Sequence, residues 1–108
     1  MNLSQLEPRF LRITSPGHHE EVDRLVDAQG LDMLCPKCWA ANGNSAVGTH
    51  HVRVWFAGRG VGDAELPKPG RWVVSGLGFA DLTLSPSILL TSGCGWHGFV
   101  TVGQVTHA

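Results

Sequence analysis

The sequence predicts a mainly β or α+β protein, in which a small zinc-ribbon-like sheet carries one N-terminal helix. Two observations lead to this fold class. Short runs of apolar residues, separated by stretches rich in glycine and proline, are typical of strands and turns. Two pairs of metal-binding side chains, each at positions i and i+3, are typical of knuckles around a structural metal ion. The chain of 108 residues suits a single zinc-binding domain, 1–108.

Residues 1–30 are expected to form a strand and then a helix. The strand is predicted at 9–14. Ser15 resembles a helix N-cap, and Pro16 suits the first helical position. An apolar stripe at helical spacing follows, and a glycine at its end is a plausible stop: Val22, Leu25, Val26 and Gly30. The pattern predicts one helix over roughly 17–29.

Residues 31–108 are expected to form a β core that carries both knuckles. Strands are predicted at 50–56, 71–74 and 87–91, with Val52, Val54 and Phe56 on one face of the first. The glycines and prolines of 58–70 predict a long loop. Residues 99–102 and 104–106 flank Gly103 and predict a tight hairpin.

The knuckles are Cys35-Pro36-Lys37-Cys38 and Cys94-Gly95-Trp96-His97. Together they contain every cysteine of the chain and one histidine. Three thiolates and one imidazole have the ligand number and chemistry of a closed tetrahedral zinc site. The predicted Zn²⁺ ligands are therefore Cys35, Cys38, Cys94 and His97. Four protein ligands leave the metal no open position for catalysis.

Two other interpretations of the first knuckle fit the sequence less well. A thioredoxin-like redox role would need a surrounding βαβ pattern, which is missing. His18-His19-Glu20 before the Cys35 knuckle imitates a zinc deaminase signature. However, proline follows the first cysteine instead of preceding it, and the second knuckle would have no role.

Two histidines and two serines outside the knuckles could have either a functional or a structural role. His50 and His51 are interpreted as an ordinary pair at the start of a strand, although one of them could join or support the metal ligands. Ser85 and Ser87 follow Asp81, but no base is placed by sequence to activate either hydroxyl. This segment is expected to be a turn that enters a core strand.

Charge and cysteine content restrict the function class. The formal net charge is −1, and the arginines are scattered among acidic residues, so nucleic-acid binding is not expected. No stretch reaches the ~20 apolar residues of a membrane span. The start of the chain lacks the pattern of a secretory leader, and three cysteines cannot pair completely. We therefore expect a soluble, cytoplasmic protein of a reducing compartment.

Three strings carry a resemblance to a known family. They are Cys35-Pro36-x-Cys38, the segment Thr83-Leu84-Ser85-Pro86-Ser87-Ile88, and the run from Cys94 to Val100, Cys-Gly-Trp-His-Gly-Phe-Val. Over about residues 33–106 the chain resembles small uncharacterised zinc-binding proteins of phages and prophages, some of which carry the label ammonia monooxygenase. The resemblance implies a phage or prophage setting, and with it the cytoplasm of a bacterial host, and the same four ligands. The residues do not support the monooxygenase label, because thiolate-rich sites favour zinc over copper(II).

These observations together predict a non-enzymatic interaction module with a structural zinc ion that acts on a host protein. The loop 58–70 is a candidate binding edge. The alternative is a zinc-dependent hydrolase, in which water occupies one metal position and His50 or His51 is recruited. The sequence indicates neither the partner nor the oligomeric state.

Overall fold

The computed structural model describes all residues 1–108 and confirms a mainly β protein. Two four-stranded antiparallel sheets account for most of the regular structure. The first has the order β2-β1-β3-β4 and contains β1 (Arg9–Ser15), β2 (His18–Val22), β3 (Gly30–Leu34) and β4 (His51–Trp55). The second has the order β5-β6-β7-β8 and contains β5 (Val73–Ser75), β6 (Thr83–Leu89), β7 (His97–Thr101) and β8 (Gln104–His107). The helical elements are short: η1 (Leu3–Leu6), η2 (Leu25–Asp27) and α1 (Pro36–Ala41).

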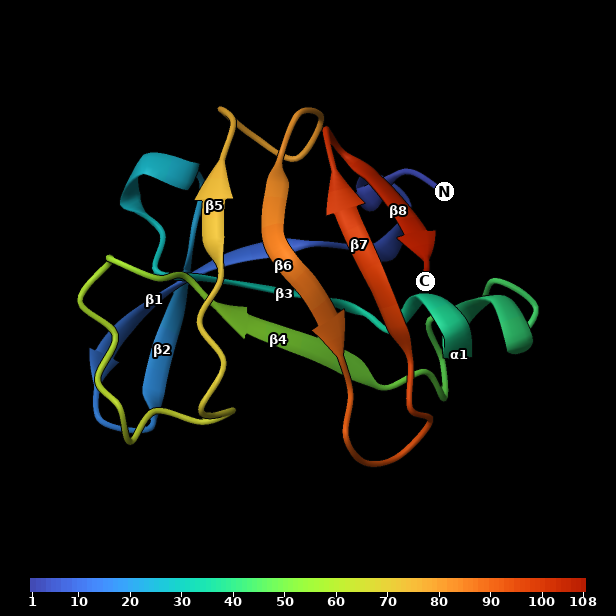
Figure 1. Cartoon of the computed structure of the whole chain (residues 1–108), viewed down its shortest axis with the longest axis horizontal. Coiled ribbons are helices and arrows are strands. Elements are labelled where there is room, and N and C mark those ends of the chain that lie inside the picture. Colours follow the sequence, from blue (N-terminus) through green and yellow to red (C-terminus); the bar gives the residue numbers. More distant parts are fainter.

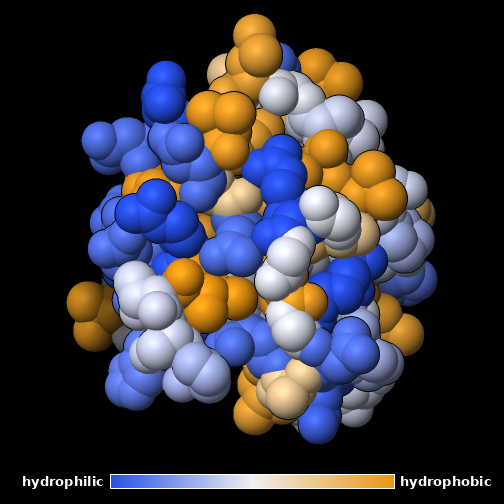
Figure 2. Space-filling model, turned by 90° about the vertical axis from the view of Figure 1, so that its left-hand side faces the viewer, coloured by the Kyte–Doolittle hydropathy of each residue, from blue (hydrophilic) through white to orange (hydrophobic).

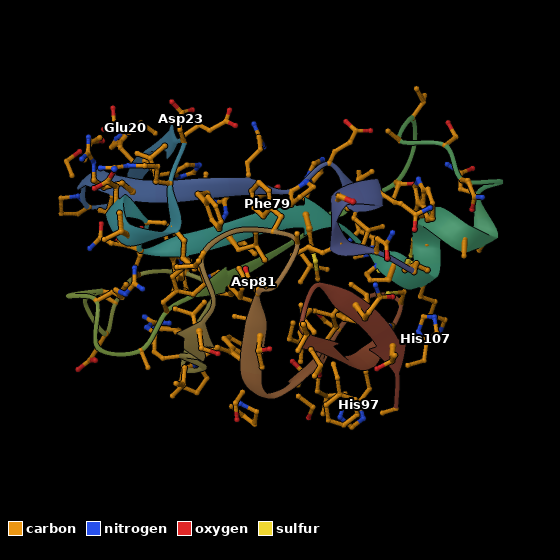
Figure 3. The ribbon with its side chains drawn as sticks, turned by 90° about the horizontal axis from the view of Figure 1, so that it is seen from above. Glu20, Asp23, Phe79, Asp81, His97 and His107 are labelled. Carbon is orange, nitrogen blue, oxygen red and sulfur yellow. The ribbon has the colours of Figure 1, made fainter.

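The two sheets form two layers whose strands cross at a steep angle (Figure 1). Eighteen buried residues form one hydrophobic cluster that includes side chains from both sheets. Leu3 and Leu6 of η1 are completely buried and belong to this cluster. Phe79, from the β5–β6 connection, lies between the layers (Figure 3) and stacks on Phe10 of β1 with ring centroids 4.1 Å apart. The apolar faces of the two sheets, neither of which could be shielded from water alone, thus cover each other.

The predicted helix over 17–29 is wrong. Ser15-Pro16-Gly17 turns the chain into a β-hairpin, and Gly17 has the positive φ of +77° that such a turn requires. Residues 18–22 pair with β1, with Phe10 opposite Val22. Only η2 is helical in this region, and Val26 is 72% exposed. The apolar stripe was too narrow to hold a helix against the core, and pairing with β1 satisfies the backbone instead.

Most of the other predicted elements are present. Strands occupy 9–15 and 51–55, and Val52 and Val54 are buried. The hairpin around Gly103 is confirmed: Val102 and Gly103 have φ of 47° and 73°, as in a two-residue turn of type I′. In the second sheet, β6 begins at Thr83. The segment from Thr83 to Pro86 is therefore strand rather than the expected turn.

The loop over 58–70 contains no helix or strand, as predicted. The Arg71 guanidinium organises its end by donating to four carbonyl oxygens, those of Gly62, Glu65, Pro67 and Gly70. The Trp55 indole, 1% exposed, donates to the carbonyl of Leu66. The loop thus covers the outer face of the first sheet beside Trp55. No helix has both the length and the apolar character needed to cross a membrane.

Candidate metal centre

Four side chains converge where α1, β4 and the β6–β7 connection meet. They are Cys35, Cys38, His50 and Cys94, and their ligand atoms all lie within 4.8 Å of one another. Cys35 belongs to the hydrophobic core, and Cys38 and Cys94 pack against it, whereas His50 is exposed. The cluster therefore lies at the border between core and solvent.

The first knuckle forms because a helix starts directly after β3. Cys35 is the N-cap of α1 and Pro36 takes the first helical position, where a missing N–H costs nothing. The carbonyl of Cys35 accepts the N–H of Trp39 at 2.9 Å. This turn carries Cys38 to the same side as Cys35, so both sulfurs face one point.

The strand register brings His50 to the cluster. Leu34 lies opposite His51 in the antiparallel pair of β3 and β4, so Cys35 and His50 are the next opposite residues. The N–H of Cys35 donates to the carbonyl of His50 at 2.9 Å, which continues the ladder by one step. Opposite residues in such a pair have Cα atoms roughly 5.5 Å apart, within reach of one shared ion.

The loop that leads to His50 is held by the end of α1. Asn42, the C-cap of the helix, donates its side-chain amide to the carbonyl of Val47 at 2.6 Å and to the hydroxyl of Thr49 at 3.2 Å. Thr49 is buried and donates in turn to the carbonyl of Ser45 at 2.7 Å. These bonds fix the residue directly before His50.

Cys94 comes from the second sheet, in the connection between β6 and β7. The N–H of Leu90 donates to the carbonyl of Trp96 at 2.8 Å and closes this connection at its base. The ammonium of Lys37 in α1 donates to the carbonyl of Cys94 at 2.8 Å. A direct contact between the two predicted knuckles therefore exists beside the sulfurs.

The cluster differs from the predicted ligand set in its histidine. His97 is the first residue of β7, and its side chain extends from the second sheet on the side away from the first (Figure 3). Its Nε2 lies 2.9 Å from the hydroxyl oxygen of Ser87. Successive strand residues face opposite ways, so the buried Trp96 turns inward and His97 outward. The i+3 spacing from Cys94 therefore does not bring His97 to the sulfurs.

From sequence, His50 is expected to be an ordinary residue at the start of a strand that could join or support the metal ligands, and the structure places it in the cluster. The signal that could have found it is register. If 31–34 and 50–56 are taken as antiparallel neighbours, Cys35 and His50 fall opposite each other at the end of the pair. The sequence alone does not state which strands are neighbours, so the i+3 spacing of His97 was the stronger local pattern.

The distances suit a single tetrahedral ion. The Sγ atoms of Cys35 and Cys94 lie 3.5 Å apart, and all three cysteines are free thiols. Two sulfurs at ~2.3 Å from a tetrahedral zinc are roughly 3.8 Å apart, which is close to this separation. Three sulfurs and one imidazole nitrogen are a donor set that zinc prefers, whereas magnesium and calcium require oxygen.

Cys35 and Cys94 differ in the pKa of their thiols. Burial raises the pKa of Cys35 to about 12, and the neighbouring Cys94 contributes in the same direction. For Cys94, burial also acts to raise the pKa. Hydrogen bonds from the Trp96 N–H and from the side chains of His50, Cys35 and Cys38 outweigh it and lower the pKa to about 6. The Cys94 thiolate is thus available at neutral pH before any metal binds, whereas a metal must displace the proton of the buried Cys35 thiol.

Directly beside the cluster, His51 is held by a buried carboxylate. Its Nδ1 lies 2.6 Å from an oxygen of Asp32, which is 2% exposed. Arg53 donates to the other oxygen at 3.1 Å, and Arg9 reaches the carboxylate at 3.5 Å. Arg53 of β4 and Arg9 of β1 share this one carboxylate of β3, so the outer face of the first sheet around Asp32 carries excess positive charge.

A groove of about 650 Å³ begins at His50 and His51. One wall is the start of β4, the other is the end of β6 with the residues after it, and the segment 67–70 with Trp72 closes one end. Ser87 lies in this wall, and its hydroxyl contacts His97. Asp81 lies outside the groove; its carboxylate accepts the N–H groups of Gly78 and Leu77, which lower its pKa.

The deaminase-like residues are not part of the cluster. His18, His19 and Glu20 lie on β2, which is the edge strand of the first sheet farthest from β4. Glu20 instead accepts a hydrogen bond from the Arg12 guanidinium, and this contact raises the pKa of Arg12.

Hydrophilic residues cover much of the side of the molecule that carries β2, with hydrophobic residues between them (Figure 2).

Comparison of the chain with protein-family models, with curated proteins and with solved structures gave no match.

Proposed function

We propose that the protein is a small zinc-binding interaction module in which Cys35, Cys38, His50 and Cys94 hold one structural Zn²⁺. The observation that carries this proposal is the convergence of three thiols and one imidazole within 4.8 Å. Zinc bound to four protein ligands has no position for a substrate, so its role is to hold the fold together. Three thiolates and a neutral imidazole leave the site with one net negative charge, and the ammonium of Lys37 lies next to it.

The positions of the ligands support a role as a clamp between layers. Cys35, Cys38 and His50 belong to the segment from β3 to β4, whereas Cys94 lies in the connection between β6 and β7 of the second sheet. A zinc ion at this point would join the two sheets at Cys35, the residue that directly follows β3, an inner strand of the first sheet. Small domains commonly need such a constraint, because they bury a modest share of their surface on folding.

We further propose that the module acts on a host protein in a phage or prophage setting. The setting rests on the resemblance of the motifs described above. A protein partner, rather than nucleic acid, is supported by charge: the net charge is −1, and β5 to β8 contain no lysine or arginine. The zinc-loaded protein, used as bait in lysate of a bacterial host, should retain a host protein that the metal-free Cys94→Ser variant does not retain. Equal retention by both proteins, or no retained protein, would contradict this function.

A second candidate function is supported by the Asp32–His51 pair. A histidine held by a buried carboxylate next to a groove is an arrangement that general bases use. In this alternative the exposed His50 leaves the metal, water takes its place, and the protein is a zinc-dependent hydrolase. Cobalt substitution separates the two functions. Cyanide should leave the visible spectrum of the Co²⁺ form unchanged if four protein ligands close the site, and should shift it if a water ligand can be replaced.

A further inference from the structure

We propose that the groove beside the metal centre binds an acidic, extended peptide segment of a partner protein, which adds as a strand to the open edge of β4. This inference rests on the proposed function as an interaction module and names the surface and the chemistry of the partner. It depends on three features of the groove: free backbone groups, apolar walls and unbalanced positive charge.

The free backbone groups follow from the register of β4. Val52 and Val54 lie opposite Met33 and Leu31, and the bond from Cys35 to His50 sets which pairs are hydrogen-bonded. In an antiparallel pair these alternate, so the N–H and C=O groups of His51 and Arg53 point away from β3. β4 is the last strand of its sheet, so no further strand of the sheet takes up these groups.

The chain itself already uses the other end of this edge. The N–H of Trp72 donates to the carbonyl of Trp55 at 3.0 Å, and Phe56 and Trp72 form a parallel bridge. The segment before Trp72 then leaves the edge and becomes the end wall of the groove. A peptide beside His51 and Arg53 would therefore extend pairing that the fold starts and does not complete.

The opposite wall offers apolar contact and a second free backbone position. Ile88 lies opposite Gly98, and the N–H of Leu90 bonds to Trp96, so the backbone groups of Leu89 point away from β7. β5 pairs only with residues 83–85 of β6 and leaves this part uncovered. The indole of Trp72 bonds to the carbonyl of Ser87 at 3.2 Å and provides a rigid apolar surface at the end of the groove.

The charge of the lining selects an acidic peptide. Arg53 and Lys68 line the groove, and none of the lining residues is acidic. The nearest carboxylate, Asp32, is buried behind Arg53 and shared with Arg9. Carboxylates of a peptide would therefore meet positive charge, whereas lysine or arginine side chains would be repelled. His50 links this wall to the metal, so zinc binding would hold the groove in shape.

A degenerate library of cysteine-free eight-residue peptides tests the inference with zinc-loaded protein of verified metal content. The peptides that the immobilised protein retains should be enriched in aspartate and glutamate and depleted in lysine and arginine. The charge reversal Lys68→Glu should lower retention about five-fold or more, since it replaces attraction by repulsion. Arg24→Glu changes the net charge equally at an exposed position outside the groove and should retain the same peptides as the unmodified protein.

Backbone pairing is tested separately with the most enriched peptide. N-methylation of the alternate peptide amides that face β4 should abolish binding, whereas N-methylation of the amides between them should not. In a titration with the unmethylated peptide, the backbone amide NMR signals of His51, Arg53 and Leu89 should shift. No retention, retention without acidic enrichment, or equal binding after either methylation register would overturn the proposal. If the lysate bait still captures a host protein in that case, the interaction function stands and only this groove is wrong.

Discussion

The Sγ atoms of Cys35 and Cys94 lie 3.5 Å apart, although 59 positions of sequence separate the two residues. Cys35 directly follows β3, an inner strand of the first sheet, and Cys94 lies between two strands of the second. Each sheet therefore contributes sulfur to one cluster, and the two layers meet at a chemically defined point as well as through the hydrophobic core.

Removal of zinc should destabilise the whole protein rather than one loop. At free zinc about 1,000-fold above the dissociation constant, binding stabilises the fold by about 4 kcal/mol. For a domain of this size each kcal/mol shifts Tm by roughly 4 °C, so chelation should lower Tm by about 15 °C. Thermal unfolding with and without chelator measures this. A Cys94→Ser variant whose Tm does not respond to chelator is the matched control.

Substitution of the two candidate histidines should have opposite outcomes. His50→Ala removes a ligand and should weaken zinc binding on the order of 100-fold, as measured by competition with a chromophoric chelator. His97→Ala should leave the zinc affinity unchanged, because that imidazole contacts Ser87 outside the cluster. The reverse pattern would show that the histidine of the second knuckle is the ligand after all.

The metal-free protein should contain one unusually reactive thiol. Because the pKa of Cys94 is lowered to about 6, its thiolate persists until the pH falls through that value. Cys35 is buried and its pKa is raised to about 12, so it should remain unreactive at neutral pH. Iodoacetamide should therefore modify Cys94 first, with a half-maximal rate near pH 6, and zinc should protect it. Mass mapping after short exposure at several pH values checks this, and preferential modification of Cys35 would contradict it.

Asp32 should be required for stability independently of the metal. Its buried carboxylate accepts contacts from Arg9, Arg53 and His51. The three partners are partly exposed and can be hydrated when the carboxylate is removed, so Asp32→Ala should cost about 2 kcal/mol in the free energy of unfolding, the usual cost of losing hydrogen bonds to a charged group. Urea denaturation of the zinc-loaded variant measures it. Asp23→Ala, an exposed position on the surface, should change the free energy of unfolding by less than ~0.5 kcal/mol.

Two glycines with the same backbone conformation should tolerate alanine differently. Gly103 and Gly17 have φ of 73° and 77°, so both substitutions carry similar backbone strain. A Cβ on Gly103 would overlap the carbonyl of Ala80, whereas one on Gly17 meets open space. Gly103→Ala should therefore destabilise the protein by at least about 1 kcal/mol more than Gly17→Ala. Equal denaturation midpoints for the two variants would show that backbone strain at positive φ, and not the overlap with the Ala80 carbonyl, determines the loss of stability.

The β class could be predicted from sequence because short local patterns of residues indicate strands and turns. The strand that contains Val52 and Val54 and the hairpin around Gly103 depend on alternation and turn chemistry, which act over a few residues. The helix over 17–29 failed for the opposite reason: the pairing of Phe10 with Val22 depends on a neighbouring strand, and that pairing overrides a weak helical pattern.

The cluster could be predicted in part for the same reason. The three cysteines of the two short knuckles can be recognised as metal ligands from their residue type and spacing. The histidine does not, because His50 reaches Cys35 only through the pairing of β3 with β4. His97 matches the spacing, but a strand that starts at that residue turns its side chain outward. Ligands within a turn can be found from sequence, whereas a ligand supplied by sheet register cannot.

The most direct test of the central claim is the metal content and coordination of protein purified without added metal, measured by elemental analysis and X-ray absorption. The structure predicts one zinc per chain, surrounded by three sulfurs at ~2.3 Å and one imidazole nitrogen at ~2.0–2.1 Å, with no oxygen ligand. An oxygen in the coordination sphere, fewer than three sulfurs, or protein that contains no zinc would contradict a closed structural site.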